Sequence, residues 1–352
     1  KRFLAITLAM GLVEHNSLAS YWDTNTVLSI PLFSAVMPRN CYIIIIMQFL
    51  HFNDKAAAVA PNEPGYDRLY KLRPLIDSIS QRFAEVYNPF QNICVDESLL
   101  LFKGRLRFCQ YIPSKHSRYG IKFYKLCESS TGYTSYFMLY EGKDTNLNPP
   151  RLSELTASGK IVWELITPLL GRSYHLYVDN FYTSIPLFRA LHTLDTPACG
   201  TVNRKHKGLP RELLDKKLKR GEVHVLRSNE LLAIKYSDTK VVLMLTTIHD
   251  ETIIVQHRSG SRPSKTKPLC SKEYSKHMGG VDKTDQIQNY YNVTRKTRAW
   301  YKKTFMTQMA LYNSYFVYKA AVPGPRLSYY NYLLQLLPAF LFGDVEEVPD
   351  MP

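Results

Sequence analysis

The chain has 352 residues with a net charge of +15, and 12% of its residues are aromatic. This length exceeds the usual size of one domain, so we expect one large α/β core with helical additions or an insertion. A basic surface can bind acidic lipid or nucleic acid, or can simply increase solubility. Here the positive charges cluster and interleave with aromatic residues, which favours nucleic acid as the partner.

The six cysteines are scattered without a CxxC pair. This pattern argues against a zinc cross-brace or a dense disulfide framework and predicts reduced, mostly buried thiols. The apolar runs are too short or too interrupted to span a bilayer, so we predict no membrane segment. Because the chain begins at Lys1 without a signal-like start, we expect an excised piece that lacks its natural termini and any targeting signal.

The first 90 residues are predicted to be helical. Apolar residues recur at helical spacing over residues 69–87, and apolar runs at 3–10 and 43–52 predict two more helices. Basic residues fall between the apolar positions of this region, on a face that meets either solvent or DNA, and the solvated face is the safer interpretation.

Residues 92–105 form an apolar run rich in β-formers with one ionisable residue, Asp96, at its centre. A strand would place Cys94, Asp96 and Ser98 on one face and hold Asp96 rigidly beside a candidate site. The simpler interpretation of this segment alone is an edge strand whose polar residues lie in water.

The next elements are predicted to be three antiparallel strands and then alternating helices and strands. The strands are expected at residues 105–112, 121–128 and 133–140, followed by a helix at 162–170, a strand at 174–178, a helix at 185–192 and a strand at 198–202. Asp179 directly follows one of these strands, at the position that active sites favour in open α/β sheets.

The composition turns strongly basic between residues 203 and 220, which indicates the start of an inserted basic module. Two β-rich runs at 223–236 and 240–248 follow it. The polar stretch 257–268 has little apolar content and predicts a flexible loop.

A helix beginning near Gly280 is predicted to carry Asp282 and Asp285 on one face, three residues apart. Acidic residues in a first helical turn also simply complement the helix dipole. Further on, basic residues surround Trp300 and Tyr301. That arrangement fits base stacking with phosphate contact, or the buried stripe of an amphipathic helix, which we favour for Trp300.

Several motifs, in order along nearly the whole chain, resemble the piggyBac transposase family. They are VDE at 95–97 with FKGR at 102–105, QYIPSK at 110–115, YGIK at 119–122, VDNFYTS at 178–184, GGVDKTDQ at 279–286 and RKTRAW at 295–300. The chain departs from the family at His116, where a proline is common, and no counterpart of the cysteine-rich C-terminal zinc domain is present in this sequence. The second departure puts recognition of terminal repeats in doubt more than the chemistry.

The resemblance implies an α/β fold: an RNase H-like DDE catalytic core with a helical N-terminal region and a basic β-rich insertion. It makes Asp96, Asp179 and Asp282 the catalytic, metal-binding triad, with Asp285 as a further acidic residue of the metal site. The expected domains are a helical N-terminal region at 1–90, the first part of the core at 91–202, the basic insertion at 203–256, the second part of the core at 257–325 and a C-terminal tail at 326–352.

Such a triad would hold two Mg²⁺ ions, with Mn²⁺ as a substitute, about 3.5–4 Å apart. The resemblance further implies a homodimer in the nucleus that acts on double-stranded DNA, both transposon ends and TTAA targets, through nicking, hairpin formation and joining. We predict DNA contacts from basic residues of the motifs, the insertion and the C-terminal cluster: Lys103, Arg105, Lys115, Lys122, Lys216, Lys217, Lys219, Arg220, Arg295, Lys296, Arg298 and Trp300.

Two other functions fit the same residues. A domesticated derivative would bind DNA or chromatin without cutting it, for which the basic patches suffice. A cytoplasmic RNA nuclease would keep the metal site but act on a different substrate. The intact acidic positions favour the transposase.

Overall fold

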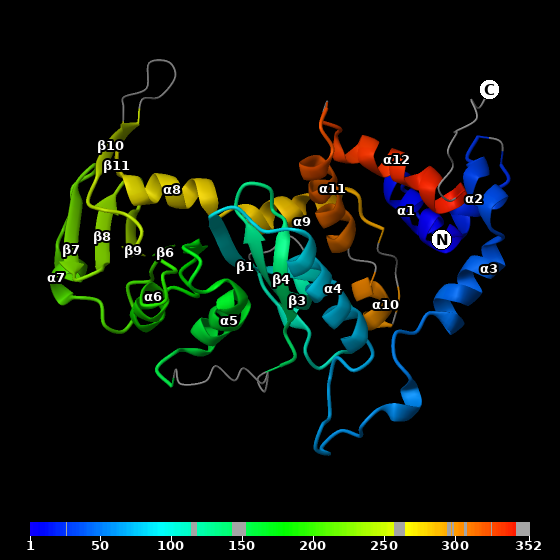
Figure 1. Cartoon of the computed structure of the whole chain (residues 1–352), viewed down its shortest axis with the longest axis horizontal. Coiled ribbons are helices and arrows are strands. Elements are labelled where there is room, and N and C mark those ends of the chain that lie inside the picture. Colours follow the sequence, from blue (N-terminus) through cyan, green and yellow to red (C-terminus); the bar gives the residue numbers. More distant parts are fainter. Residues whose placement is uncertain are drawn as a thin grey trace. The chain divides into compact units, whose positions relative to one another are not determined.

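A computed structural model of the chain describes residues 1–25, 27–113, 118–142, 153–256, 265–293, 297, 299–305, 308–324 and 326–342 (Figure 1). The chain divides into two compact units. The first comprises Lys1–Arg82, Leu100–Gly120 and Gln286–Pro352, and the second comprises Phe83–Leu99 and Ile121–Asp285. The domain boundaries expected from the sequence stay predictions.

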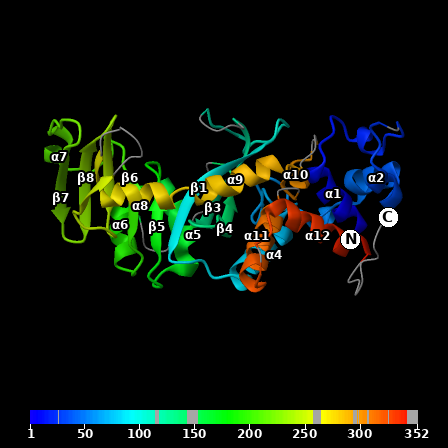
Figure 2. The same cartoon turned by 90° about the horizontal axis from the view of Figure 1, so that it is seen from above.

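The first unit is mainly helical. Its α-helices are α1 (Arg2–Leu12), α2 (Pro31–Val36), α3 (Arg39–Ile44), α10 (Trp300–Phe305), α11 (Met309–Ala321) and α12 (Tyr329–Phe342), while α4 (Arg73–Val86) begins in this unit and ends in the second. Helix α1 packs against α12 although they stand at opposite ends of the sequence (Figure 2). The stretch that we expected to be a C-terminal tail therefore contains α12, whose Leu333 is fully buried in the helical core.

Most of the second unit is built on a mixed sheet. The sheet has nine strands, all of which except β2 lie wholly or mainly in this unit: β1 (Asn92–Leu101), β2 (Gln110–Tyr111), β3 (Tyr119–Glu128), β4 (Thr134–Leu139), β5 (His175–Val178), β6 (Ala198–Thr201), β7 (Val223–Ser228), β8 (Leu231–Ser237) and β9 (Val241–Thr246). The order is β2-β3-β1-β5-β6-β9-β8-β7, with β4 also pairing β3. Strands β1, β5 and β6 are parallel, and the strands β9, β8 and β7 extend the same sheet in antiparallel fashion beyond β6. This mixed α/β arrangement confirms the RNase H-like fold class.

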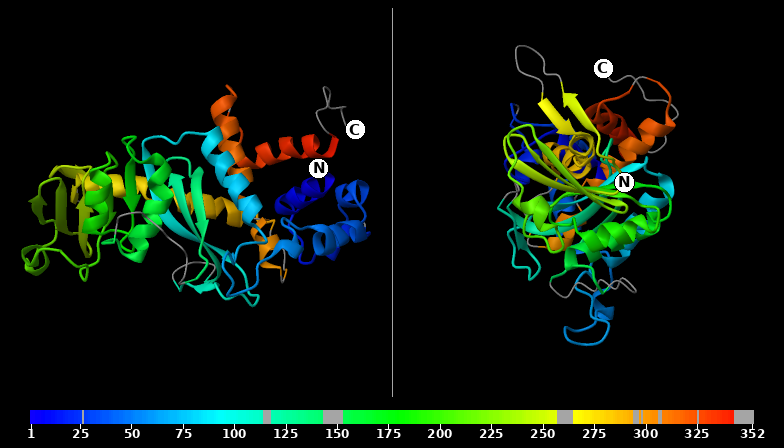
Figure 3. Two further views of the ribbon diagram at one scale, coloured as in Figure 1. Left: turned by 60° about the horizontal axis from the view of Figure 1, so that its bottom comes forward. Right: turned by 90° about the vertical axis from the view of Figure 1, so that its left-hand side faces the viewer.

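Alternation along the strands divides the core of the second unit between two faces. Ile93 and Val95 of β1 pack on one face with α5 (Ala157–Ile166) and α6 (Ile185–His192). Cys94 packs on the opposite face with residues of α8 (Leu269–His277) and with the start of α9 (Gly280–Tyr290). Figure 3 shows the ribbon from two further sides, with α5 and α6 in green and α8 in yellow. Asp96 has the same strand parity as Cys94, so its backbone position directs it to the α8 and α9 face.

Three expected elements differ in the structure. Of residues 105–112, only Gln110–Tyr111 form a strand, because the chain turns at Cys109, whose N–H donates to the Leu106 carbonyl. The run 223–236 is two strands joined at Asn229, which has a positive φ of 51°. The stretch 257–268 ends in β11 (Lys265–Pro268), which pairs with β10 (Ile253–Gln256), because backbone pairing does not require apolar side chains.

The cysteines agree with the sequence-based expectation of reduced, mostly buried thiols. All six cysteines are free, and Cys94, Cys127, Cys199 and Cys270 are buried. Within the described ranges, no helix is both long and apolar enough to cross a membrane.

Candidate active site

Asp96 and Asp179 occupy neighbouring positions on two parallel strands. The register of β1 and β5 pairs Cys94 with Tyr177 and Val95 with Val178. Asp96 is the next residue of β1, and Asp179 is the residue directly after the end of β5. Neighbouring strands lie about 4.8 Å apart, so the two aspartates are neighbours. Both side chains are partly buried. The prediction that Asp179 directly follows a strand agrees with the end of β5 at Val178.

A turn after β5 fixes the backbone of Asp179. One of its carboxylate oxygens accepts a hydrogen bond from the Phe181 N–H at 2.9 Å, and its carbonyl accepts from the Thr183 hydroxyl at 2.8 Å. This turn lies close to β6: a Cβ at Gly200 would stand 2.2 Å from the Thr183 hydroxyl and 2.6 Å from the Val178 carbonyl. Glycine at position 200 is therefore needed for the turn to approach the sheet.

Glu97, next to Asp96, is held by an aromatic and a basic side chain. The Tyr182 hydroxyl donates to a Glu97 carboxylate oxygen at 3.1 Å, and the Lys122 ammonium lies 4.0 Å from the same oxygen. Burial raises the pKa of Tyr182 well above its ordinary value, and the charges of Glu97 and Asp96 raise it further. Asp96 is thus flanked by a structured polar group, and its own carboxylate accepts from the Glu97 N–H at 2.8 Å.

Tyr274 of α8 lies within the electrostatic reach of both aspartates. Its pKa is raised to about 12, first by burial and then, against the lowering effect of a hydrogen bond with Thr201, by the charges of Asp179 and Asp96. No sequence pattern singles out this residue, because a single tyrosine in a polar helix has no distinguishing neighbours. The structure adds it to the surroundings of the two carboxylates.

Helix α9, which carries Asp282 and Asp285, begins at Gly280 as predicted and is seated against the sheet. A Cβ at Gly280 would stand 2.7 Å from the Cys94 sulfur and 2.8 Å from the Glu128 carbonyl. One turn later, the Thr284 hydroxyl donates to the Gly132 carbonyl at 2.6 Å. The helix therefore touches β1 at Cys94, two residues before Asp96.

The second contact between α9 and β1 is made by Asp285. Its carboxylate oxygen accepts hydrogen bonds from the Ser98 hydroxyl at 2.7 Å and from the Lys125 ammonium at 2.8 Å. Cys94 and Ser98 lie on either side of Asp96 along β1, and Gly280 and Asp285 lie on either side of Asp282 along α9. Asp282 is solvent-exposed in this arrangement, whereas Asp285 is partly buried.

The chemistry of the donors fits a hard divalent cation. Asp96, Asp179 and Asp282 offer only carboxylate oxygens, which Mg²⁺ and Mn²⁺ accept. Among the residues that the structure describes, no three His, Cys, Asp or Glu side chains are close enough together to hold a metal ion. The structure brings two carboxylate positions side by side and holds the helix of the third against the same strand.

The predicted DNA-binding residues are distributed over both units. The exposed ones are Lys103, Arg105 and the four that were predicted within the insertion, Lys216, Lys217, Lys219 and Arg220. Lys122 is only 9% exposed, and its ammonium lies 4.7 Å from the ring centre of Tyr124. Lys115, Arg295, Lys296 and Arg298 lie outside the described residues.

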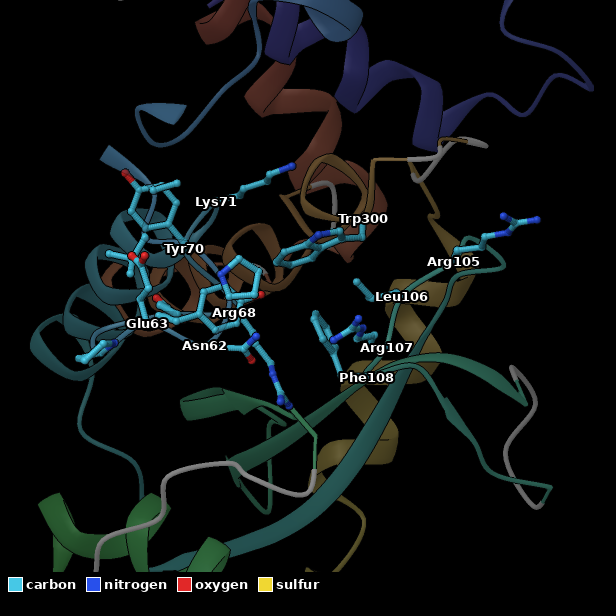
Figure 4. Close-up of a pocket in the computed structure, with 16 residues that line it drawn as sticks. Asn62, Glu63, Arg68, Tyr70, Lys71, Arg105, Leu106, Arg107, Phe108 and Trp300 are labelled. Carbon is cyan, nitrogen blue, oxygen red and sulfur yellow. The ribbon is translucent and has the colours of Figure 1, made fainter. Parts of the chain in front are cut away.

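A cavity of about 730 Å³ in the first unit combines positive charge with aromatic rings (Figure 4). Arg105 and Trp300, both predicted to contact DNA, line it. Trp300 is partly buried and meets the Phe108 ring edge-on at 5.4 Å, so it serves as packing and as cavity wall at once. Other lining residues include Arg68, Lys71, Arg107, Tyr66 and Tyr70.

The chain is similar to several known proteins. A family model described as Transposase IS4 matches residues 1–315. The human piggyBac transposable element-derived protein 3 is 27% identical over 334 residues, which cover 91% of this chain and 54% of that protein, and the human piggyBac transposable element-derived protein 2 is 27% identical over 318 residues, covering 86% and 51%. The chain thus spans about half the length of these curated relatives.

A solved structure is also similar. It is a cryo-EM structure of a piggyBac transposase synaptic complex with hairpin DNA, with a TM-score of 0.84 and 27% sequence identity. The likeness covers 97% of this chain and 70% of that one. It therefore includes both the sheet and the helical unit.

Proposed function

Because this chain belongs to the Transposase IS4 family and is of piggyBac type, we propose that it is the catalytic core of a DNA transposase that cleaves strands and joins the ends to TTAA targets. The observation that carries the proposal is the register that places Asp96, in the middle of β1, beside Asp179, which directly follows β5. The seating of α9 on β1 adds Asp282 from a third element.

Asp96, Asp179 and Asp282 would hold divalent cations, Mg²⁺ or in its place Mn²⁺. Bound there, such ions supply an activated nucleophile on one side of the phosphorus and a stabilised leaving oxygen on the other. The protein contributes rigid placement: Asp96 stands on a central strand and Asp179 on a turn braced against Gly200. Without cations, the like charges of the neighbouring carboxylates oppose each other, which favours cation binding.

The substrate proposed is double-stranded DNA, both transposon ends and target, and its phosphates would meet the exposed basic residues of the insertion and of the segment around Arg105. Aromatic residues of the cavity in the first unit, Trp300 among them, offer faces on which bases stack. Action on DNA ends in pairs and on genomic targets leads us to propose a homodimer that works in the nucleus.

A second candidate is a derivative that binds DNA without cutting it. The two human relatives are named transposable element-derived proteins, which keeps this candidate open beside the first. The two candidates share the basic surface and differ only in the use of the carboxylates.

The test uses labelled hairpin-end DNA with Mg²⁺ or with EDTA, and a labelled RNA hairpin as a parallel substrate. We expect Asp96→Asn, Asp179→Asn and Asp282→Asn each to abolish Mg²⁺-dependent cleavage of DNA while binding persists, since an amide cannot supply the charge that holds a cation. Asp77→Asn, on the exposed face of α4, is the matched control and keeps activity.

Substantial cleavage by Asp96→Asn would contradict the assignment of the triad. Tight DNA binding by the wild type without any cleavage would favour the second candidate, and cleavage confined to RNA would exclude both.

A further inference from the structure

Lys125 is a lysine in the core of the sheet. It lies on β3, is only 1% exposed, and stands among residues that are all buried from Ile121 to Ser129. Its strand parity matches that of Cys127, which packs on the face covered by α8 and α9. A charge in such a place is costly unless it is paired and hydrogen-bonded.

The partner of Lys125 is Asp285 of α9. The ammonium lies 2.8 Å from a carboxylate oxygen of Asp285, and the side chains are 2% and 21% exposed. The hydroxyl of Ser98 donates to the same oxygen at 2.7 Å. One carboxylate oxygen thus joins three elements: β1 through Ser98, β3 through Lys125, and α9.

Both charges also act on the buried thiol of Cys127 beside them. Burial raises the pKa of Cys127 to about 11, while the Lys125 charge lowers it and the Asp285 charge raises it. The pair is therefore part of the packed interior of the second unit.

We propose that Lys125 and Asp285 form a positioning pair that sets where Asp282 stands relative to Asp96; this inference rests on the proposed function. Asp282 precedes Asp285 by three residues and so lies nearly above it on the same side of α9. The helix is held at its start by Gly280 against Cys94 and at the next turn by Asp285 against Ser98 and Lys125. These two contacts fix both the rotation of α9 and its position along β1.

The pairing also indicates whether Asp285 binds a cation directly or only positions α9. A carboxylate oxygen that already accepts from an ammonium at 2.8 Å and a hydroxyl at 2.7 Å has its charge compensated. A divalent cation on that oxygen would face the repulsion of the buried Lys125 ammonium. Asp285 acts through its placement of α9, and Asp282 is the residue of this helix that faces the cation.

The experiment compares wild type, Lys125→Met, Asp285→Asn and the double variant, measuring the thermal midpoint of unfolding and Mn²⁺ affinity by calorimetry, with strand cleavage as a third readout. Each single variant leaves one partner of a buried pair uncompensated, so each lowers the midpoint, whereas the double variant recovers much of it. Lys276→Met, whose side chain is 65% exposed on α8, is the control for loss of one positive charge.

The sign of the Mn²⁺ result is decisive. If the pair positions Asp282, Asp285→Asn binds Mn²⁺ about 10–100-fold more weakly than the wild type. Lys125→Met also binds Mn²⁺ more weakly, and the double variant binds it more tightly than either single variant. Tighter Mn²⁺ binding by Lys125→Met, with a double variant as weak as Asp285→Asn, would make Asp285 a metal ligand and overturn the inference. Absence of Mn²⁺ binding by the wild type itself would contradict the proposed function, and with it this inference.

Discussion

At the scale of single residues, the candidate site depends on two glycines, whose lack of a side chain allows the backbone to approach its neighbours closely. Gly280 lets α9 approach the Cys94 sulfur, and Gly200 lets the Asp179 turn approach β6. In both places the contact is with buried atoms of the sheet, which have no room to move aside. The carboxylates are placed by these close approaches.

Gly280→Ala tests this dependence. A methyl group there would stand 2.7 Å from the Cys94 sulfur and 2.8 Å from the Glu128 carbonyl, so the helix must shift. We expect a loss of roughly 1–3 kcal/mol in the free energy of unfolding, the usual cost of overpacking, measured by urea denaturation. Gly279→Ala is the matched control because nothing lies within 4 Å of its added methyl group. Equal stability of the two variants would show that α9 is not tightly seated.

At the scale of elements, β5, α8 and the segment after β9 bring three histidines together. His277 of α8 lies against the Tyr177 ring at 5.0 Å, and its Nε2 is 3.1 Å from the Glu273 carboxylate. Burial lowers the pKa of His277, His175 and His249. The positive charge of His277 further lowers the pKa of His175 and His249. The negative charge of Glu273 raises the pKa of His249 and His277 and so opposes part of the shift.

The direction of these shifts predicts a loss of stability in acid. A histidine whose pKa is depressed in the folded state binds its proton more readily when the chain is unfolded, so its contribution is complete above the ordinary pKa of 6.5 and is lost as the pH falls below it. We expect the midpoint of thermal unfolding to fall between pH 7 and pH 5, and His277→Gln to make that fall shallower. His192→Gln, on the exposed side of α6, is the control. An identical pH profile for His277→Gln and wild type would exclude the cluster as the cause.

The elements also show what the sequence can and cannot predict. Alternation identified β1 and the face of Asp96, and the position after an apolar run identified Asp179, because both depend on local pattern. The pairing of Lys125 with Asp285 could not be predicted, since two residues far apart in the chain carry no mutual signal in one sequence. One clue was available: Lys125 stands between Tyr124 and Leu126 in a run of β-forming residues, and a lysine that is buried in such a strand requires a partner.

At the scale of the whole molecule, the charge of +15 is unevenly spread. The segment before β7 presents four exposed cations in a short stretch: Lys216, Lys217, Lys219 and Arg220. The strands that follow them continue the same sheet as Asp96 and Asp179. The strands β7, β8 and β9 are hydrogen-bonded into that sheet, so DNA held by these cations would be held by the unit that carries Asp96 and Asp179.

Replacing these four residues with glutamine should flatten the dependence of log affinity on log salt concentration. Each lost phosphate contact on duplex DNA reduces the slope by up to about 0.9. The comparison is with a variant in which four exposed cations elsewhere in the same unit, Arg172, Lys240, Lys272 and Lys276, become glutamine. A DNA titration at several salt concentrations measures both slopes. Equal slopes for the two variants would attribute the effect to net charge and not to this segment.

The contact between Ser98 and Asp285 joins residues 187 positions apart in the chain. Pairings of such long range form slowly, because a long loop must close before the contact stabilises anything. During synthesis, β1 leaves the ribosome long before α9 has been made. Until then, Asp282 of α9 is not available beside Asp96. The basic segment before β7 is made before α9, whereas the DNA cleavage proposed above would require α9 to be made and docked on β1.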